Sequence, residues 1–554
     1  MNRAVRWDRR APVRQGLAAV VATLLLVGCG PDREAEQIRA AVREGDLTKA
    51  TTVLNDLHGT SSDDALVRIM DQGLIDHLAG RLDAAAVSFD QALPMVDERR
   101  NRPVLSSAGR WVANDTVSEF QGRAYEHLQV DWWRTLNHLS AAEIQDGAWQ
   151  PTALLFPRKS QTVPLRPAPD LSAIDHRERA VNSARRLTLA TAKRASDDAD
   201  QGKVLVDDPA TRLLAAATVM ALPRAERGES DEQFAAAMLT QAVKLYGETA
   251  KGYADKPWRY EVKGVPALVE RLRLRQLASY DPSAVADEAG LAAARLPAGH
   301  GSVLVLNHVG FCARPEPLQI GLLAVGFSPP APTAAERARG VTSTEFSLGA
   351  IGLYAKGPGS EIARSWVALP VPGFVVQEAL APGGAAVIGF EVPVHRPDRP
   401  IGLTAGLIVD GGAPVRFEVV GDLDAQARAG LRDEQPSIVL RTLIRVLAKQ
   451  GAVAVGAKAV RQSNSGEAGL LAFLVNLIGS SLATLTESAD LRCWLTLQDH
   501  VEGVLVDLPA GTHRLVVEGA AGRHDLGEVR VTAGRLTILP FRTFTPETED
   551  RTDP

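Results

Sequence analysis

The sequence that decides the fold of the N-terminal half is Gly73-Leu74-Ile75-Asp76-His77-Leu78-Ala79-Gly80-Arg81-Leu82-Asp83-Ala84-Ala85, which continues through Phe89 and Ala92. Apolar residues recur at helical spacing on both sides of Gly80, which is placed to turn the chain. From about residue 34 the surrounding sequence has the same helical and repetitive character. These features predict helical hairpins in this half of the chain.

The same stretch resembles a tetratricopeptide repeat, a helical hairpin that stacks on its neighbours with a period of roughly 34 residues. The resemblance implies a role for each of its marked residues. Small side chains stand where two helices touch, at Gly73, Ala85 and Ala92, while Gly80 turns the corner and Phe89 fills the groove.

Two further helical pairs extend the pattern along the chain. An earlier copy has Gly45 at the turn, Ala50 at the small position and Leu54 at the large one. Its turn glycine precedes Gly80 by 35 residues, close to the period of the repeat. A weaker pair runs from about residue 209 to residue 246, with Gly228 near its turn and Ala242 at a packing position.

Residues 116–139 form another helix-periodic stretch, which contains the large side chains of Phe120, Tyr125, Trp132 and Trp133. Aromatic residues at helical spacing usually belong to the core, so packing is the expected role and a binding groove the alternative. The next stretch, 145–171, holds five prolines without a period, which predicts a long surface loop.

Near residue 299 the period changes from helical to strand-like. Ser302–Leu306 is typical of a buried strand, and Asp410-Gly411 between two apolar runs is a hairpin signal. The other predicted strands are Trp366–Val371, Ile401–Val409, Val415–Val420 and a terminal β meander of Leu491–Leu497, Val504–Leu508, His513–Val517, Glu528–Val531 and Leu536–Phe541. A helical block from residue 422 to about 460 precedes the meander.

The predicted fold class is α+β, with N-terminal α-helical TPR-like hairpins followed by a mixed α/β domain that ends in a β meander. A length of 554 residues allows three or four domains. The predicted divisions are a signal peptide at 1–28, a TPR-like helical domain at 29–290, a mixed α/β region at 299–465, an apolar helix plus meander at 466–544, and a disordered tail at 545–554. The regions 299–465 and 466–544 are expected to form one C-terminal unit.

Composition excludes several classes of protein. Hydrophobic residues make up 45% and charged residues 23%, the balance of a globular protein, so a mostly disordered, collagen-like or polytopic membrane chain is excluded. The net charge of −5 gives no strongly basic surface for nucleic acid, and no nucleic-acid partner is expected.

The N-terminus carries an export signal. Five arginines precede an apolar run from Leu17 to Val27, and Gly28-Cys29 follows. The run is too short for a transmembrane span. The residues Leu26, Val27, Gly28 and Cys29 resemble the lipobox of bacterial lipoproteins, in which the cysteine is acylated and becomes the mature N-terminus. The alternatives are an uncleaved anchor or a plain secretory signal.

The predicted location is the periplasm, with the protein anchored to the outer membrane by lipid alone. Gly30 stands where an inner-membrane retention signal would place aspartate. Removal of residues 1–28 takes away five arginines and one aspartate, which changes the net charge from −5 to −9. The remaining thiols, Cys312 and Cys493, could form a disulfide in an oxidising periplasm, and two separate buried thiols are the equal alternative.

No pattern of catalytic or cofactor-binding residues stands out, so no enzyme activity, metal or cofactor is predicted. The eleven histidines are scattered, and the phosphate-loop and nucleophile-elbow motifs are absent. His308 and Cys312 could be drawn as an imidazole–thiol pair, although a structural role is favoured. The paired carboxylates of a glycosidase remain open at this point, because any Asp or Glu could serve once the chain folds.

Two C-terminal features bear on ligands. Arg441, Arg445 and Lys449 are four residues apart on one helix, so they share a face that could hold an anionic glycan or lipid headgroup, although a solvated or ion-paired face is the commoner outcome. The uncharged stretch 468–485 approaches spanning length, but polar residues interrupt it, and a buried helix is expected.

Several phrases together resemble a family of poorly characterised bacterial outer-membrane lipoproteins with N-terminal TPR-like helices and a conserved C-terminal region. The most specific phrase surrounds Asp490, Arg492 and Trp494, while Gln498 stands where the family pattern tends to have proline. The resemblance implies no catalytic residues. Genes of such proteins are sometimes found near those of lipoproteins that activate peptidoglycan synthases.

The leading hypothesis is therefore a non-catalytic scaffold whose stacked hairpins bind envelope proteins, with peptidoglycan assembly as the suggested pathway. The alternative is a module that binds an envelope glycan, such as the cell-wall glycan, or a lipid. Its C-terminal domain would recognise this ligand through Arg441, Arg445 and Lys449.

Overall fold

The computed structural model describes residues 31–59, 61–101, 119–156, 171–200, 208–254, 260–281, 288–326, 348–356, 385–395, 406–435, 489–519 and 522–544, with a few single residues between them. The lipobox, the predicted strand 366–371, the apolar stretch 468–485 and the tail 545–554 lie outside the described residues.

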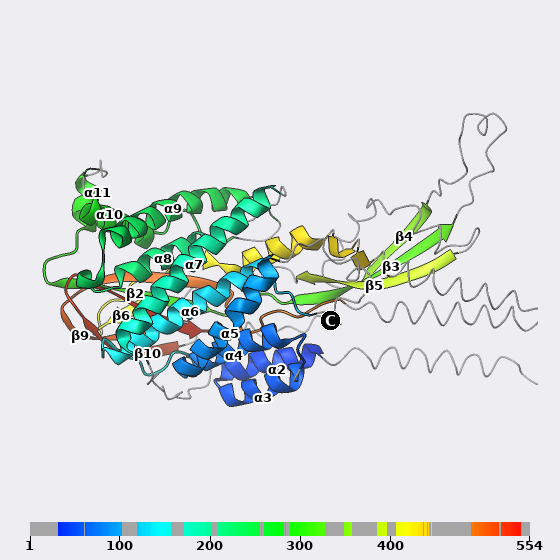
Figure 1. The fold of residues 1–554 in the computed structure, drawn as a ribbon, viewed down its shortest axis with the longest axis horizontal. Coiled ribbons are helices and arrows are strands. Elements are labelled where there is room, and N and C mark those ends of the chain that lie inside the picture. Colours follow the sequence, from blue (N-terminus) through cyan, green and yellow to red (C-terminus); the bar gives the residue numbers. More distant parts are fainter. Residues whose placement is uncertain are drawn as a thin grey trace, which may run out of the picture.

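The helices form one layer in which each packs against the next along the chain (Figure 1). They are α2 (Pro31–Glu44), α3 (Leu47–His58), α4 (Ala65–Leu78), α5 (Leu82–Asn101), α6 (Ala124–Gln145), α7 (Ala173–Asp200), α8 (Pro209–Met220), α9 (Glu229–Tyr253), α10 (Ala267–Tyr280) and α11 (Glu288–Ala294). The predicted helical hairpins are therefore present, because short connections make sequence neighbours into antiparallel neighbours.

Packing at the α4–α5 hairpin depends on two glycines. Gly80 has φ +68°, a left-handed conformation that a turn glycine adopts without strain. A Cβ atom at Gly73 would come within 2.9 Å of the Phe89 ring, so only glycine lets the two helices approach this closely. Ala85 and Ala92 are fully buried in the same contact.

Helix α6 is displaced from the predicted span 116–139. It begins at Ala124 because the Glu126 carboxylate accepts a 2.6 Å hydrogen bond from the backbone N–H of Arg123, which caps the first turn. Phe120 thus lies before the helix rather than in it. Within the predicted loop 145–171, the short strand β1 (Trp149–Gln150) joins a sheet.

Two four-stranded sheets stack beneath the helices. The central sheet has the order β11 (Leu536–Thr543), β2 (His300–Val309), β8 (His500–Pro509), β7 (Glu418–Asp422), with β11 parallel to β2 and the other pairs antiparallel. The outer sheet has the antiparallel order β1, β10 (Gly522–Val531), β9 (Gly511–Gly519), β6 (Gly406–Val409).

The alternation of side chains along β2 explains the layers. Val303 and Val305 pack into the core between the two sheets, whereas Leu304 and Leu306 pack into the core between the central sheet and the helices. That second core runs from Ala35 in α2 to Phe544 after β11, so the predicted boundary near residues 290–299 does not separate two cores.

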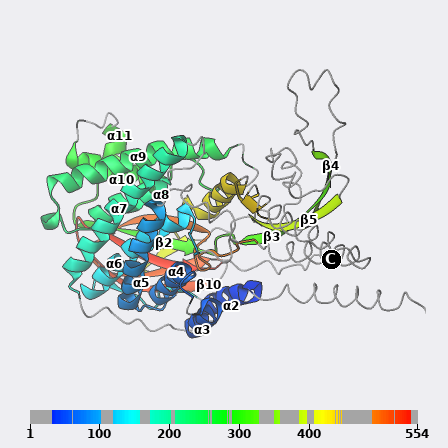
Figure 2. The ribbon, with the colours of Figure 1, turned by 45° about the vertical axis from the view of Figure 1, so that its right-hand side comes forward.

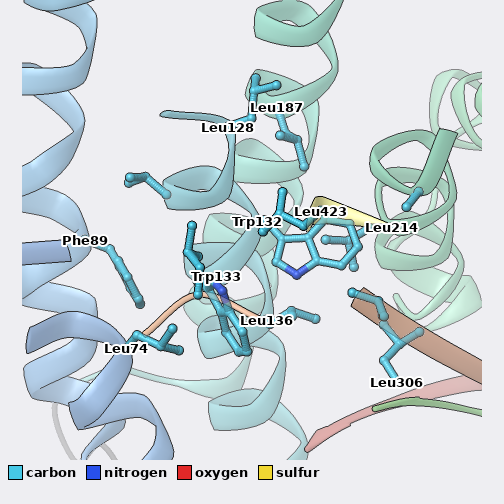
Figure 3. Close-up of a cluster of buried hydrophobic side chains, with 14 of the residues drawn as sticks. Leu74, Phe89, Leu128, Trp132, Trp133, Leu136, Leu187, Leu214, Leu306 and Leu423 are labelled. Atoms are coloured by element: carbon cyan, nitrogen blue, oxygen red, sulfur yellow. The ribbon is translucent and has the colours of Figure 1, made fainter. Parts of the chain in front are cut away.

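The core beneath the helices is centred on α6 (Figure 3). Trp132 and Trp133 lie between Leu74 and Phe89 on one side and Leu306 on the other. The large aromatics predicted at helical spacing are therefore packing residues, and both indole rings are at most 2% exposed.

Three predictions about the C-terminal region need correction. The last strands do not form a meander, because β8 and β11 belong to the central sheet and β9 and β10 to the outer one. Residues 491–497 form no strand. The turn at Asp410-Gly411 is present, with φ +50° and +75°, but after the bridge between Leu407 and Val415 the chain crosses to the central sheet as β7.

A third sheet, which we call the arm, projects away from the helices and the two stacked sheets (Figures 1 and 2). It consists of β4 (Leu348–Lys356), β3 (Pro315–Gly326) and β5 (Ala385–His395) in that order, with antiparallel pairs. Within the described part of the chain, the extensive contacts of these strands are with one another.

Candidate functional site

The groove predicted for the helical hairpins is filled by the chain itself. Residues 489–499, which we call the inserted segment, run between the helical layer and the central sheet without regular secondary structure. All the residues from Cys493 to Gln498 are buried. The candidate binding site of the hairpins is thus occupied by a segment without regular secondary structure from the other end of the chain.

Carboxylates on two helices hold the backbone of the inserted segment. Asp71 of α4 accepts hydrogen bonds from the N–H groups of Leu495 (3.2 Å) and Thr496 (2.8 Å) and from the Thr496 hydroxyl (2.7 Å). Glu126 of α6 accepts from the N–H of Trp494 at 2.7 Å. These N–H groups are therefore unavailable to a neighbouring strand, which explains why the predicted strand 491–497 does not form.

Two buried arginines hold the carbonyl groups. Arg39 of α2 donates to the Leu495 carbonyl at 2.9 Å, and it also reaches the Cys312 carbonyl at 2.8 Å. Arg542 of β11 donates to the carbonyl of Thr496, and its guanidinium lies 5.0 Å from the centre of the Phe311 ring. The negatively charged carboxylates thus accept from N–H groups of the segment, and the positively charged guanidinium groups donate to its carbonyl groups.

Burial shifts the pKa values of these groups. Burial raises the pKa of Asp71 to about 7, although the hydrogen bonds from Thr496 and Leu495 act in the other direction. Burial likewise lowers the pKa of Arg542 to about 9. Asp71, Glu126, Arg39 and Arg542 each bond at least one backbone group of the inserted segment, so the arrangement holds a peptide backbone.

Asp490, Arg492 and Trp494, the residues that carry the sequence resemblance, are the side-chain anchors of the inserted segment. Arg492 donates to both carboxylate oxygens of Asp490, at 2.9 and 2.8 Å, and to Asp64 at the start of α4, at 2.8 Å. Trp494 is buried, and its ring lies 6.5 Å from that of Phe89, the residue predicted to fill the groove. The structure thus brings Asp490, Arg492 and Trp494 together with the hairpin residues.

Gln498, where the family pattern tends to have proline, also has a structural role. Its side-chain oxygen accepts from the Trp133 indole N–H at 3.1 Å, and its amide group donates to Gln129 at 2.8 Å. A proline side chain could make neither bond. This position therefore couples the end of the inserted segment to α6.

His308 and Cys312 do not form the imidazole–thiol pair considered from the sequence. The Nε2 atom of His308 accepts from the Trp132 indole at 3.1 Å, so its Nδ1 donates to the Phe541 carbonyl at 3.2 Å. Burial lowers the pKa of this imidazole to about 3. The Cys312 thiol instead faces the Leu423 carbonyl, 3.9 Å away.

Cys312 and Cys493 do not form a disulfide. Both are buried free thiols, so the structure favours the second of the two alternatives left open by the sequence. Burial raises the pKa of Cys493 to about 12, which keeps it a thiol and leaves it poorly nucleophilic.

Within the part of this helix that the structure describes, one residue of the basic row is buried and another is partly exposed. Arg445 is only 2% exposed, and it donates to the Thr442 hydroxyl at 3.2 Å. Arg441 donates to the Ser437 carbonyl at 3.3 Å, and Lys449 lies outside the described residues. A spacing of four residues shows which side chains share a face, but it does not show whether that face meets solvent.

A small cavity lies between the start of α6, the end of α9 and the helical residues 423–435. It has a volume of about 20 Å³ and is lined by Arg123, Tyr253 and Glu434, among others. The Tyr253 hydroxyl has no hydrogen-bond partner among the described residues. A cavity of this size holds a water molecule, whereas ligand pockets measure roughly 300–1,000 Å³.

The parts of the chain that the structure describes contain no group of three or more His, Cys, Asp or Glu side chains arranged for a metal ion. None of their helices combines the length and hydropathy needed to cross a membrane. Neither protein-family models, nor curated proteins, nor solved structures match the chain.

The histidine after the inserted segment gives a pH-dependent stability. Burial alone would lower the pKa of His500, but the carboxylates of Asp499 and Glu502, 3.4 and 3.7 Å from its ring nitrogens, raise it to about 10. A raised folded-state pKa stabilises the fold below the unfolded value of roughly 6.5, and this contribution is lost as pH rises through 10.

We therefore expect the stability advantage of the wild type over His500→Gln to shrink by at least ~1.4 kcal/mol between pH 6.5 and pH 10. Urea unfolding of both proteins at matched ionic strength measures it. An advantage that stays constant with pH would show that His500 is neutral in the folded protein.

Proposed function

We propose that this chain is a non-catalytic periplasmic lipoprotein, tethered to the outer membrane through lipid on Cys29, that acts as a protein-interaction scaffold in cell-envelope assembly. The lipobox at residues 26–29 and the TPR-like hairpins support the proposal, as does the resemblance to outer-membrane lipoproteins.

The observation that carries the proposal is the occupied groove. The carboxylates of Asp71 and Glu126 and the guanidinium of Arg39 clamp the inserted segment, so the helical layer and the central sheet share one polar junction as well as one core. A body joined in this way is a stiff platform. Its partners then bind to the solvent side of the helical layer, because the inner side is taken.

Exposed apolar residues mark that solvent side. Val87 on α5 and Leu189 on α7 are 56% and 73% exposed, and both helices pack against α6. Exposed apolar side chains supply apolar contacts when a partner covers them, so we choose these two as the positions to test. The glycan-binding alternative loses support because Arg445 is buried.

Crosslinking in living cells tests the proposal, with the lipidated protein tagged at Pro554 and its adducts identified by mass spectrometry. We expect a short, reproducible set of envelope proteins that is lost in Val87→Asp/Leu189→Asp. The matched control is Asp83→Asn, which alters another exposed position on α5. An adduct set that survives the double substitution would remove the proposed surface, and glycan adducts without proteins would overturn the scaffold.

A further inference from the structure

Two buried histidines meet where α6 packs against α7 (Figure 1). The Nδ1 atoms of His138 on α6 and His176 on α7 lie 3.0 Å apart, and their ring centres are 5.2 Å apart. Neither residue is more than 1% exposed. A hydrogen bond between two Nδ1 atoms needs a hydrogen on one and a lone pair on the other. The histidine pair, as we call His138 and His176, is therefore bonded only while a single hydrogen lies between the two Nδ1 atoms.

Each proton added to the histidine pair disturbs this contact. The first has to bind the Nε2 atom of the donor ring, and both Nε2 atoms are buried without a hydrogen-bond partner among the described residues. The second has to bind the Nδ1 atom of the acceptor ring, where two N–H groups would then face each other. His77 differs, because its Nδ1 donates to the Asn137 side-chain oxygen at 3.0 Å, a bond that a protonated ring keeps.

The positive charges around the histidine pair favour its neutral form. Burial lowers the pKa of His138 to about 2, and the charges of Arg134 on α6 and Arg179 on α7 act in the same direction. Burial and Arg179 also lower the pKa of His176. The carboxylate of Asp90 on α5 is engaged with both arginines, since it accepts a 2.6 Å hydrogen bond from Arg134 and lies 3.5 Å from Arg179.

The remaining charged groups on the two helices that flank His176 point elsewhere. The Asp175 carboxylate acts to raise the pKa of His176, but it is exposed and accepts from the N–H and hydroxyl of Ser172 at 3.0 and 2.7 Å. On α8, which also packs against α7, Arg212 donates to the Thr188 carbonyl at 2.8 Å. That carbonyl is about three turns farther along α7 than His176.

We propose that the histidine pair is an acid-sensitive switch between α6 and α7. At neutral pH its hydrogen bond holds the start of α7 on α6, and in acid the two protonated rings repel each other and release it. His176 lies in the first turn of α7, which begins at Ala173. An opening that starts there leaves the sheets folded, because local opening costs less than global unfolding. The switch depends on neither the lipid anchor nor the partners proposed above.

Hydrogen exchange of the full chain, corrected for the intrinsic rate at each pH, tests the switch. A histidine whose folded pKa lies below its unfolded value near 6.5 stabilises the closed state above that pH, and this contribution is lost as pH falls. We expect the protection of residues 173–187 to fall at least about tenfold from about pH 6.5 to about pH 5. In His138→Gln/His176→Gln, whose amides take up no proton in this range, we expect a change of less than about twofold.

Two further variants serve as controls. His176→Gln offers His138 an amide oxygen that a protonated ring still bonds, so its loss of protection should lie between those of the wild type and the double variant. His300→Gln, at the partly exposed start of β2, should behave as the wild type does. Thermal unfolding at neutral pH shows that each variant folds.

Protection of residues 173–187 that stays constant with pH in the wild type, or falls equally in the double variant, would overturn the switch. So would an equal loss of protection in β2 and β8, because acid would then unfold the whole body rather than open α7. The comparison of α7 with β8 needs only the wild type, so it decides the question even where a variant does not fold.

Discussion

Replacing Asp71 with alanine will lower the free energy of unfolding by about 3 kcal/mol or more. The carboxyl group is fully buried and is the acceptor for two N–H groups and one hydroxyl of the inserted segment. Its removal leaves these donors in an apolar core without a partner, at roughly 1–3 kcal/mol for each one that water cannot reach.

Urea unfolding at neutral pH measures the loss, and Asp83→Ala is the control, because Asp83 is an exposed acidic residue on the neighbouring helix. Asp83 lies in the first turn of α5, where a carboxylate interacts favourably with the helix dipole, so the control is expected to lose no more than about 1 kcal/mol. Similar losses in the two variants would mean that the inserted segment is not held by Asp71 and that the groove is not its binding site.

The importance of Asp71 could have been predicted in part from the sequence. It lies three and four residues before Leu74 and Ile75, so a helix places all three on the same side, and Glu126 stands in the same relation to Val130. A carboxylate on the apolar face of a helix needs a buried donor. The sequence pattern shows this need, but it does not show that the donors lie more than 400 residues away.

Local signals predicted the hairpins, because a helix period and a turn glycine act within about thirty residues. The sheets could not be predicted in this way. β11 pairs in parallel with β2 across more than 200 residues, and no local pattern specifies that pairing. Leu491, Cys493 and Leu495 alternate as in a strand, yet all residues from Cys493 to Gln498 are buried, and side chains of α4 and α6 bond the N–H groups that a strand would use.

The second large effect is expected at Gly301, near the start of β2. A Cβ atom there would overlap the carbonyl oxygen of Thr532 and approach that of Arg535 to 3.1 Å. Both oxygens belong to the connection between β10 and β11, which is fixed to β2 by the hydrogen bond from the Ser302 N–H to the Arg535 carbonyl at 2.9 Å. The backbone of this connection cannot move away from a new Cβ atom without breaking that hydrogen bond.

Gly301→Ala is therefore expected to lower the free energy of unfolding by about 3 kcal/mol or more, by separating β2 from the turn that brings β11 alongside it. Gly430→Ala is the matched control, because Gly430 lies in the helical residues 423–435 with open space around its Cβ position. The unfolded chain has less conformational entropy to lose with alanine than with glycine, so Gly430→Ala should raise the free energy of unfolding by up to about 1 kcal/mol. Opposite signs for the same substitution, measured by urea unfolding, would locate the tight contact at the β2–β11 junction. A neutral Gly301→Ala would show that the parallel pairing of these strands is looser than the structure describes.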